Sequence, residues 1–189
     1  MIDIKKQVPN LLTVFRILAS LIFTFLIFKN DIGGAFLLFA FASISDFLDG
    51  YLARKWNVVS DLGKILDPIA DKVLMFCSYC IFAYDSSIPV WISVIVIGRD
   101  ILILFVVLIC KILKIDLKIS PLRSSKINTT IQLLFVIMIL LLRYFRVDFP
   151  ILINIGSAVV CVSTLFSGAD YFRNYYWIKD AICKATNRR

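Results

Sequence analysis

Long apolar stretches alternate with short polar breaks along the whole chain. They fall at residues 9–29, 33–53, 65–84, 88–111, 127–146 and 150–176. Each is close to the roughly 20 residues with which an α-helix crosses the hydrocarbon core of a bilayer. The pattern therefore predicts an all-α integral membrane protein, in which six transmembrane helices pack as one bundle and residues 1–189 form a single domain.

The breaks between these stretches contain residues that favour turns and helix starts. Asp31-Ile32-Gly33-Gly34 predicts a turn between the first two helices. Pro89 and Pro150 predict the starts of the fourth and sixth helices, because proline is tolerated there.

The composition supports the membrane assignment and limits the chemistry. Hydrophobic residues make up 60% of the chain, whereas soluble domains have about 45–50%. All 13 acidic residues are aspartates, and histidine is absent. Ser-His and Cys-His nucleophiles are therefore excluded, and any acid–base chemistry by carboxylates must use aspartate.

Two cysteines form a C-x-x-C pattern at Cys77 and Cys80, which can indicate a zinc or redox site. No second pair and no histidine complete a tetrahedral zinc site. Because both lie in an apolar stretch, we interpret them as small apolar residues of a membrane helix.

Positive charge is distributed unevenly between the two ends of the predicted helices. Only Lys29, Arg143 and Arg146 lie on the side of the 1–2, 3–4 and 5–6 connections. The positive-inside rule therefore predicts that both termini and the 2–3 and 4–5 loops are cytoplasmic, with the protein in the cell (inner) membrane. We attribute the net charge of +8 to orientation and to attraction by anionic lipids, and we expect no nucleic-acid partner. The basic residues on the predicted cytoplasmic side are Lys5, Lys6, Arg54, Lys55, Lys64, Lys111, Lys114, Lys118, Arg123, Lys126, Arg173, Lys179, Lys184, Arg188 and Arg189.

Five aspartates occur where the second and third helices reach the cytoplasmic side, in DFLDGYLARKWNVVSDLGKILDPIAD, and four of them form two closely spaced pairs. Asp46 and Asp49 are three residues apart, and Asp67 and Asp71 are four apart, so each pair shares a helix face. The short connection predicts that the two helices are antiparallel neighbours. We therefore expect the four carboxylates to line one polar cavity.

Four converging carboxylates at membrane depth repel one another unless cations offset their charge. One interpretation is a charged face paired with basic neighbours. The alternative is divalent metal, because hard oxygen ligands suit Mg²⁺ or Mn²⁺ and two such ions can hold a diphosphate. Small residues on the same helix faces would leave room for a nucleotide. The basic neighbours are Arg54, Lys55, Lys64 and Lys72, and the small residues are Gly50, Ala53 and Gly63.

The same segment resembles the signature of the CDP-alcohol phosphatidyltransferases at all eight fixed positions. These positions are Asp46, Asp49-Gly50, Ala53-Arg54, Gly63, Asp67 and Asp71. The resemblance extends over nearly the whole chain, since the opening PNLLTVFR is similar to the family's entry into its first helix.

The resemblance implies a role for each signature residue. Asp46, Asp49 and Asp67 would ligate two divalent cations, and Asp71 would contact the second cation and act as the general base. Asp46 would also border the bound CDP group. Gly50, Ala53 and Gly63 would face the cytidine nucleotide, and Arg54 would hold its phosphates.

The resemblance further implies a homodimer and transfer of a phosphatidyl group from CDP-diacylglycerol to an alcohol, with release of CMP. Asn10, Thr13 and Arg16 match the first-helix pattern. They either border the site or form a helix start with an arginine that extends to the membrane surface.

Residues of the fourth predicted helix and of the segment that follows it indicate which alcohol is the acceptor. Arg99, Arg123 and Lys126 would together make a cationic pocket for an anionic acceptor. The alternative is a local Arg99–Asp100 pair and ordinary loop charge. These stretches resemble cardiolipin synthases, whose acceptor is phosphatidylglycerol.

Phosphatidylglycerophosphate synthases are the other candidate, with glycerol 3-phosphate as acceptor. They usually carry a second arginine seven residues after the first, where this chain has Val106. A small cation transporter or channel, or an inactive lipid-binding scaffold, are alternatives of a different class.

Overall fold

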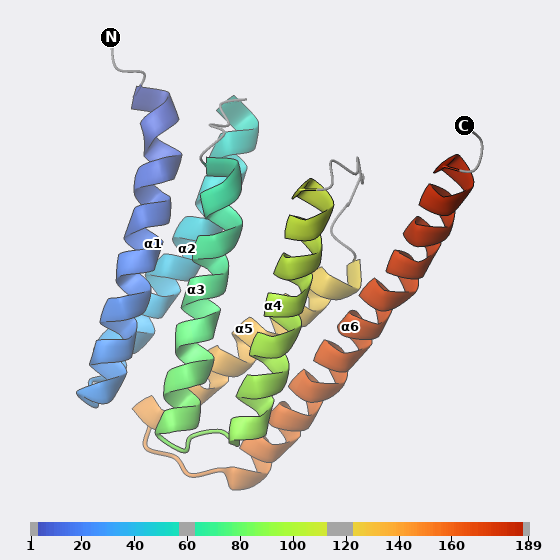
Figure 1. Ribbon diagram of the computed structural model, residues 1–189. Coiled ribbons are helices and arrows are strands. Elements are labelled where there is room, and N and C mark those ends of the chain that lie inside the picture. Colours follow the sequence, from blue (N-terminus) through green and yellow to red (C-terminus); the bar gives the residue numbers. More distant parts are fainter. Residues whose placement is uncertain (1–3, 57–62, 113–122, 187–189) are drawn as a thin grey trace. The chain divides into compact units, whose positions relative to one another are not determined.

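The computed structural model describes the backbone of residues 4–56, 63–112 and 123–186 and the side chains of residues 15–45, 72–105, 123–171 and 173. Six helices and no strand occur in this part of the chain (Figure 1). The all-helical class predicted from the apolar stretches is confirmed. The helices are α1 (Ile4–Phe28), α2 (Ile32–Trp56), α3 (Gly63–Tyr84), α4 (Val90–Ile112), α5 (Arg123–Tyr144) and α6 (Pro150–Thr186).

The observed helices follow the predicted apolar stretches, but two of them extend well into polar sequence. α1 begins at Ile4, before the apolar stretch that starts at residue 9, and α6 continues to Thr186, ten residues past 176. Apolar runs locate the part of a helix that meets lipid, whereas the helix itself ends only where its backbone hydrogen bonds stop. Pro150 opens α6 and Pro89 directly precedes α4, as predicted.

The predicted turn at residues 31–34 is wrong in position. The chain turns at Lys29 and Asn30, and Asn30 has a φ of 62°. Asp31 then caps α2, because its Oδ1 accepts the Gly34 N–H at 3.0 Å and its carbonyl accepts the Ala35 N–H at 3.1 Å. An aspartate at the N-cap satisfies otherwise unpaired N–H groups, so the two glycines after it are helical.

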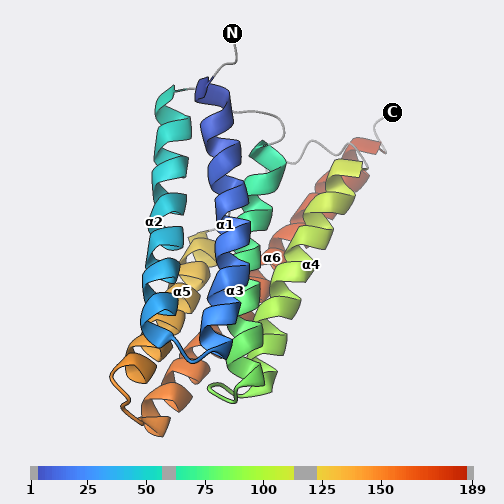
Figure 2. The same ribbon diagram turned by 90° about the vertical axis from the view of Figure 1, so that its left-hand side faces the viewer.

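The described residues fall into two compact units, and each is considered by itself. In the first unit, which consists of residues 1–87 and 136–149, α1 packs against both α2 and α3. Phe23 of α1 lies at the centre of this packing, with its ring centroid 5.6 Å from that of Phe39 and 6.3 Å from that of Phe82. Figure 2 shows α1 and α3 running in one direction and α2 in the other.

Arg143 near the end of α5 connects three segments of the first unit that lie far apart in sequence. It pairs with Asp85 and donates to Ser87 Oγ at 3.2 Å and to Asn30 Oδ1 at 3.5 Å. Asn30 belongs to the α1–α2 connection, and Asp85 and Ser87 belong to the α3–α4 connection. The two connections therefore lie at the same end of this unit.

The second unit consists of residues 88–135 and 150–189 and contains α4, the first part of α5, and α6. α4 packs against α6. One face of α6 carries three buried hydroxyl residues, Ser157, Thr164 and Ser167, within its apolar stretch Pro150–Tyr171. Small hydroxyl side chains let membrane helices approach closely and form hydrogen bonds between them.

Large apolar side chains remain exposed on most of the described helices. Two helical stretches in the described part, Arg123–Tyr144 and Pro150–Tyr171, are long and apolar enough to cross a membrane, and only 22% of the most apolar window of the second is buried. Water would make this exposure costly, whereas lipid tails are as apolar as the side chains. Exposed members on α6 are Ile151, Leu152, Ile155, Val159, Val162, Leu165 and Phe166.

Candidate active site

The four aspartates of the signature lie on two helices of the first unit. Asp46 and Asp49 belong to the C-terminal part of α2, and Asp67 and Asp71 belong to the first turns of α3. Both segments are helical, so the spacings of three and four residues place each pair on one helix face. The two segments lie at the same end of the unit (Figures 1 and 2).

The side chains of these residues lie outside the described part of the structure. The same holds for Gly50, Ala53, Arg54 and Gly63, and for Asn10 and Thr13 on α1. Their assignment to metal and nucleotide therefore stays a prediction. Among the side chains that are described, no three potential metal ligands come together.

Arg16 on α1 is the largest fully buried side chain of the described set, with 1% of its surface exposed. The sequence left open whether it borders the site or extends to the membrane surface. An arginine that extends to a lipid–water boundary keeps its guanidinium at the surface. Arg16 instead lies inside the protein, on the helix that packs against both α2 and α3.

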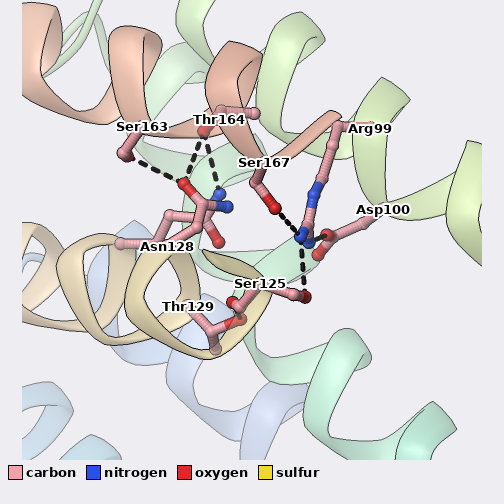
Figure 3. A network of polar contacts seen from close by, with 9 residues as sticks. Arg99, Asp100, Ser125, Asn128, Thr129, Ser163, Thr164 and Ser167 are labelled. Atoms are coloured by element: carbon pink, nitrogen blue, oxygen red, sulfur yellow. Dashed lines mark hydrogen bonds and ion pairs between the residues drawn. The ribbon is translucent and has the colours of Figure 1, made fainter. Parts of the chain in front are cut away.

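In the second unit, Arg99 is held by a buried network that joins three helices (Figure 3). Its Nη1 donates to Asp100 Oδ1 at 2.6 Å, and its Nη2 donates to Ser125 Oγ at 2.8 Å and to Ser167 Oγ at 2.5 Å. The ring of Tyr171 lies 5.9 Å from the guanidinium carbon. The local pair of Arg99 with Asp100 therefore exists, and the guanidinium also reaches the first turn of α5.

The other two predicted acceptor residues lie beside this network in sequence. Arg123 and Lys126 flank Ser125 in the first turn of α5, and both side chains are exposed. No acidic residue occurs in that turn. The positive end of the helix dipole adds to the two cationic side chains. This turn is therefore electropositive, and Arg99 contacts it through Ser125.

Two fully buried amide side chains join α5 to α6 next to the arginine network. Asn128 Oδ1 accepts hydrogen bonds from Ser163 Oγ at 2.8 Å and Thr164 Oγ1 at 3.1 Å. Gln132 Nε2 donates to Thr164 Oγ1 at 3.2 Å. Buried polar groups linked in this way fix the position of one membrane helix against another.

Comparison with known proteins decides the family. A family model described as CDP-alcohol phosphatidyltransferase matches residues 6–167. The chain belongs to this family. Family membership gives the general class of activity, which is phosphatidyl transfer to an alcohol in phospholipid synthesis.

Relatives within the family carry two different names. A rat protein named cardiolipin synthase (CMP-forming) is 31% identical over 181 residues, which cover 87% of this chain and 60% of the rat protein. A Rickettsia prowazekii protein named CDP-diacylglycerol–glycerol-3-phosphate 3-phosphatidyltransferase is 31% identical over 178 residues, which cover 90% of this chain and 96% of that protein. A Streptomyces coelicolor cardiolipin synthase (CMP-forming) is 33% identical over 106 residues, covering 53% of this chain and 49% of that protein.

The membership agrees with the resemblance inferred from the signature at Asp46–Asp71 and speaks against a transporter or channel. It leaves the acceptor open, because the two kinds of relative are equally similar to this chain. Sequence reasoning missed Ser125 and Ser167, the two hydroxyls that hold Arg99. The regular spacing of hydroxyl residues along α6 could have indicated Ser167.

Cys77 is half-buried and Cys80 is exposed, and their interpretation as small apolar residues stays a prediction. Both are free thiols on α3. No described side chain gathers with them into a group of three potential metal ligands.

Proposed function

We propose that this phosphatidyltransferase makes cardiolipin, by transferring the phosphatidyl group of CDP-diacylglycerol to phosphatidylglycerol and releasing CMP. Two of the relatives described above are cardiolipin synthases. The observation that carries the choice of acceptor is the pairing of Arg99 with Asp100 inside the buried network.

The reaction needs one proton acceptor and one leaving group. In the proposal, the carboxylate of Asp71 takes the proton of the acceptor hydroxyl. The hydroxyl oxygen forms a bond to the β-phosphorus of CDP-diacylglycerol, and the bond from that phosphorus to the CMP oxygen breaks. Gly50, Ala53 and Gly63 leave room for the cytidine nucleotide, and Arg54 holds its phosphates.

The donor set on α2 and α3 fits two divalent cations, Mg²⁺ or Mn²⁺. Asp46, Asp49, Asp67 and Asp71 offer only carboxylate oxygens, which are ligands that such hard cations prefer. One pair lies in the C-terminal part of α2 and the other in the first turns of α3, and these two segments are at the same end of the first unit. When bound, the cations offset charge on the diphosphate and on the leaving group.

The acceptor site is proposed at the first turn of α5, where Arg99, Arg123 and Lys126 supply positive charge. The charge of Arg99 is offset by Asp100 at 2.6 Å. Arg123 and Lys126, the two exposed cations of the turn, form no ion pair among the described residues. A phosphodiester such as phosphatidylglycerol carries one negative charge, whereas glycerol 3-phosphate carries nearly two and favours several fixed cationic donors. The apolar Val106, which stands in place of a second arginine on α4, likewise favours phosphatidylglycerol as the acceptor.

A phosphatidylglycerophosphate synthase is the second candidate. It is favoured by the Rickettsia relative, which this chain matches over 96% of its length. In that case glycerol 3-phosphate would occupy the turn of α5, with Arg123 and Lys126 supplying the extra charge. Only the acceptor distinguishes the two candidates.

The proposal includes six membrane spans in one domain, with both termini and the active site on the cytoplasmic side. The contacts of Arg143 support it, because they bring the two connections that should be extracytoplasmic to one end of the first unit. A homodimer is proposed from the family resemblance alone. The partners are CDP-diacylglycerol, an anionic acceptor and membrane lipid.

The test is a competition between acceptors. Purified protein in mixed micelles receives CDP-diacylglycerol with equal concentrations of phosphatidylglycerol and glycerol 3-phosphate, and mass spectrometry quantifies both lipid products. We expect cardiolipin to dominate. A large excess of phosphatidylglycerophosphate would assign the second function instead.

A further inference from the structure

The hydroxyls of Ser125 and Ser167 converge on a single nitrogen of Arg99 from two different helices. Ser125 lies in the first turn of α5 and Ser167 lies on α6, 26 and 68 residues away from Arg99 in sequence. Figure 3 shows both side chains directed at the guanidinium. We propose that these two serines are positioning residues, which hold the guanidinium of Arg99 in the orientation that the acceptor phosphate requires.

Hydroxyls suit this task better than carboxylates would. An arginine side chain has several rotatable bonds and loses entropy when it is fixed. A second carboxylate would fix Arg99 but would turn a neutral pair into a net negative cluster, which repels an anionic acceptor. A serine oxygen accepts a hydrogen bond without adding charge, so the two serines orient Arg99 and leave its charge balance with Asp100 unchanged.

The serine hydroxyls also keep a proton for a ligand. Each accepts a bond from Arg99 Nη2, and neither donates its O–H to a partner among the described residues. Arg99 Nε is likewise buried without a hydrogen-bond partner in the described part of the structure. A phosphate oxygen that reaches this cluster would therefore find donors whose directions are already set.

The surrounding contacts keep the two serines in register. Asn128 and Gln132 on α5 are bonded to Thr164 on α6, one turn from Ser167. A shift of α6 along α5 would break these bonds together with the contact to Arg99. Since several interhelical bonds of this kind follow one another along α5 and α6, together they fix the register of the two helices.

This inference rests on the proposed role of Arg99 at the acceptor site, and the experiment separates the two. Ser167→Ala and Ser125→Ala each remove one of the two hydroxyl oxygens that accept a hydrogen bond from Arg99 Nη2. We expect each to raise the KM for phosphatidylglycerol about tenfold, the usual effect of losing a hydrogen bond to a charged group. The KM for CDP-diacylglycerol should not change, and Ser167→Thr should restore the acceptor KM because it keeps the hydroxyl.

Ser157→Ala is the matched control. Ser157 is a buried serine on the same helix, and its hydroxyl has no hydrogen-bond partner among the described residues. Its removal deletes the same atom without touching Arg99, so the acceptor KM should stay at the wild-type value. An equal rise in this variant would show a general packing effect and overturn the positioning role.

A double mutant completes the test. If the serines act through Arg99, Ser167→Ala adds little to the effect of Arg99→Ala, because residues that work as a unit are not additive. If Arg99→Ala raises the acceptor KM while neither serine variant does, the positioning role is wrong and the acceptor role of Arg99 stands. If Arg99→Ala leaves the acceptor KM unchanged, both roles are wrong, although cardiolipin formation by the wild-type protein would still support the proposed reaction.

Discussion

Replacing Asp100 by asparagine should change which acceptor the enzyme prefers. Asp100 is buried and its carboxylate lies 2.6 Å from Arg99 Nη1. Asparagine keeps an oxygen that can accept this hydrogen bond but removes the negative charge. The positive charge of Arg99 would then no longer be offset by this carboxylate, and the added positive charge attracts a dianion more strongly than a monoanion.

The size of this effect follows from Coulomb's law. For an acceptor phosphate roughly 8 Å from the former carboxylate, at an effective dielectric constant of about 20, one additional unit charge is worth about 2 kcal/mol. Glycerol 3-phosphate carries nearly one negative charge more than phosphatidylglycerol. Its kcat/KM should therefore rise roughly 30-fold relative to that of phosphatidylglycerol.

The assay is the acceptor competition described above, applied to wild-type protein, Asp100→Asn and Asp100→Glu. The glutamate variant keeps the charge and should keep the wild-type product ratio. Melting temperatures in detergent would show whether each variant is folded. An unchanged product ratio in folded Asp100→Asn would refute the reasoning that the Arg99–Asp100 pair tunes the site toward a monoanionic acceptor.

Four further predictions concern the metal site, the base, the extracytoplasmic end and the topology. Asp67→Asn should lower the rate of CMP release by orders of magnitude, as should reversible chelation by EDTA, because metal ligands act as a unit; full activity in excess EDTA would exclude a metal-dependent reaction. Asp71→Asn should still bind CDP-diacylglycerol but turn over about a hundredfold more slowly, and a near-normal kcat would remove Asp71 from the role of base. Arg143→Gln should lower the free energy of unfolding in detergent by about 1–2 kcal/mol, since the ion pair with Asp85 is only partly exposed, whereas Arg146→Gln, which loses no described partner, should change it little. Cysteine labelling should find residues 1–8, 55–63 and 180–189 on the cytoplasmic side, and an extracytoplasmic C-terminus would overturn the proposed helix count.

The helices could be predicted from the sequence because their apolar runs have the length that a bilayer imposes. The position of the first turn could not, since Gly33 and Gly34 favour turns as strongly as Asp31 favours capping a helix. The structure selects the cap, as the bond from the Gly34 N–H to Asp31 shows. Local signals of similar strength compete at such sites, and tertiary packing decides between them.

What the sequence indicates about the candidate site rests on residues that are close together in the chain. The spacing of Asp46, Asp49, Asp67 and Asp71 within 26 residues gave the family directly. The bond between Arg99 and Ser167 spans 68 residues, and a single serine in an apolar helix carries no pattern that names its partner. Contacts of this kind depend on helix packing, which the hydrophobic pattern constrains but does not specify.

The most direct test of the proposed reaction is the stoichiometry of CMP release by purified protein given CDP-diacylglycerol, with and without phosphatidylglycerol. Direct transfer predicts that CMP appears only with the acceptor and in a one-to-one ratio with newly formed cardiolipin. CMP release without acceptor would indicate a hydrolase. No CMP release with either phosphatidylglycerol or glycerol 3-phosphate would contradict a phosphatidyltransferase function altogether.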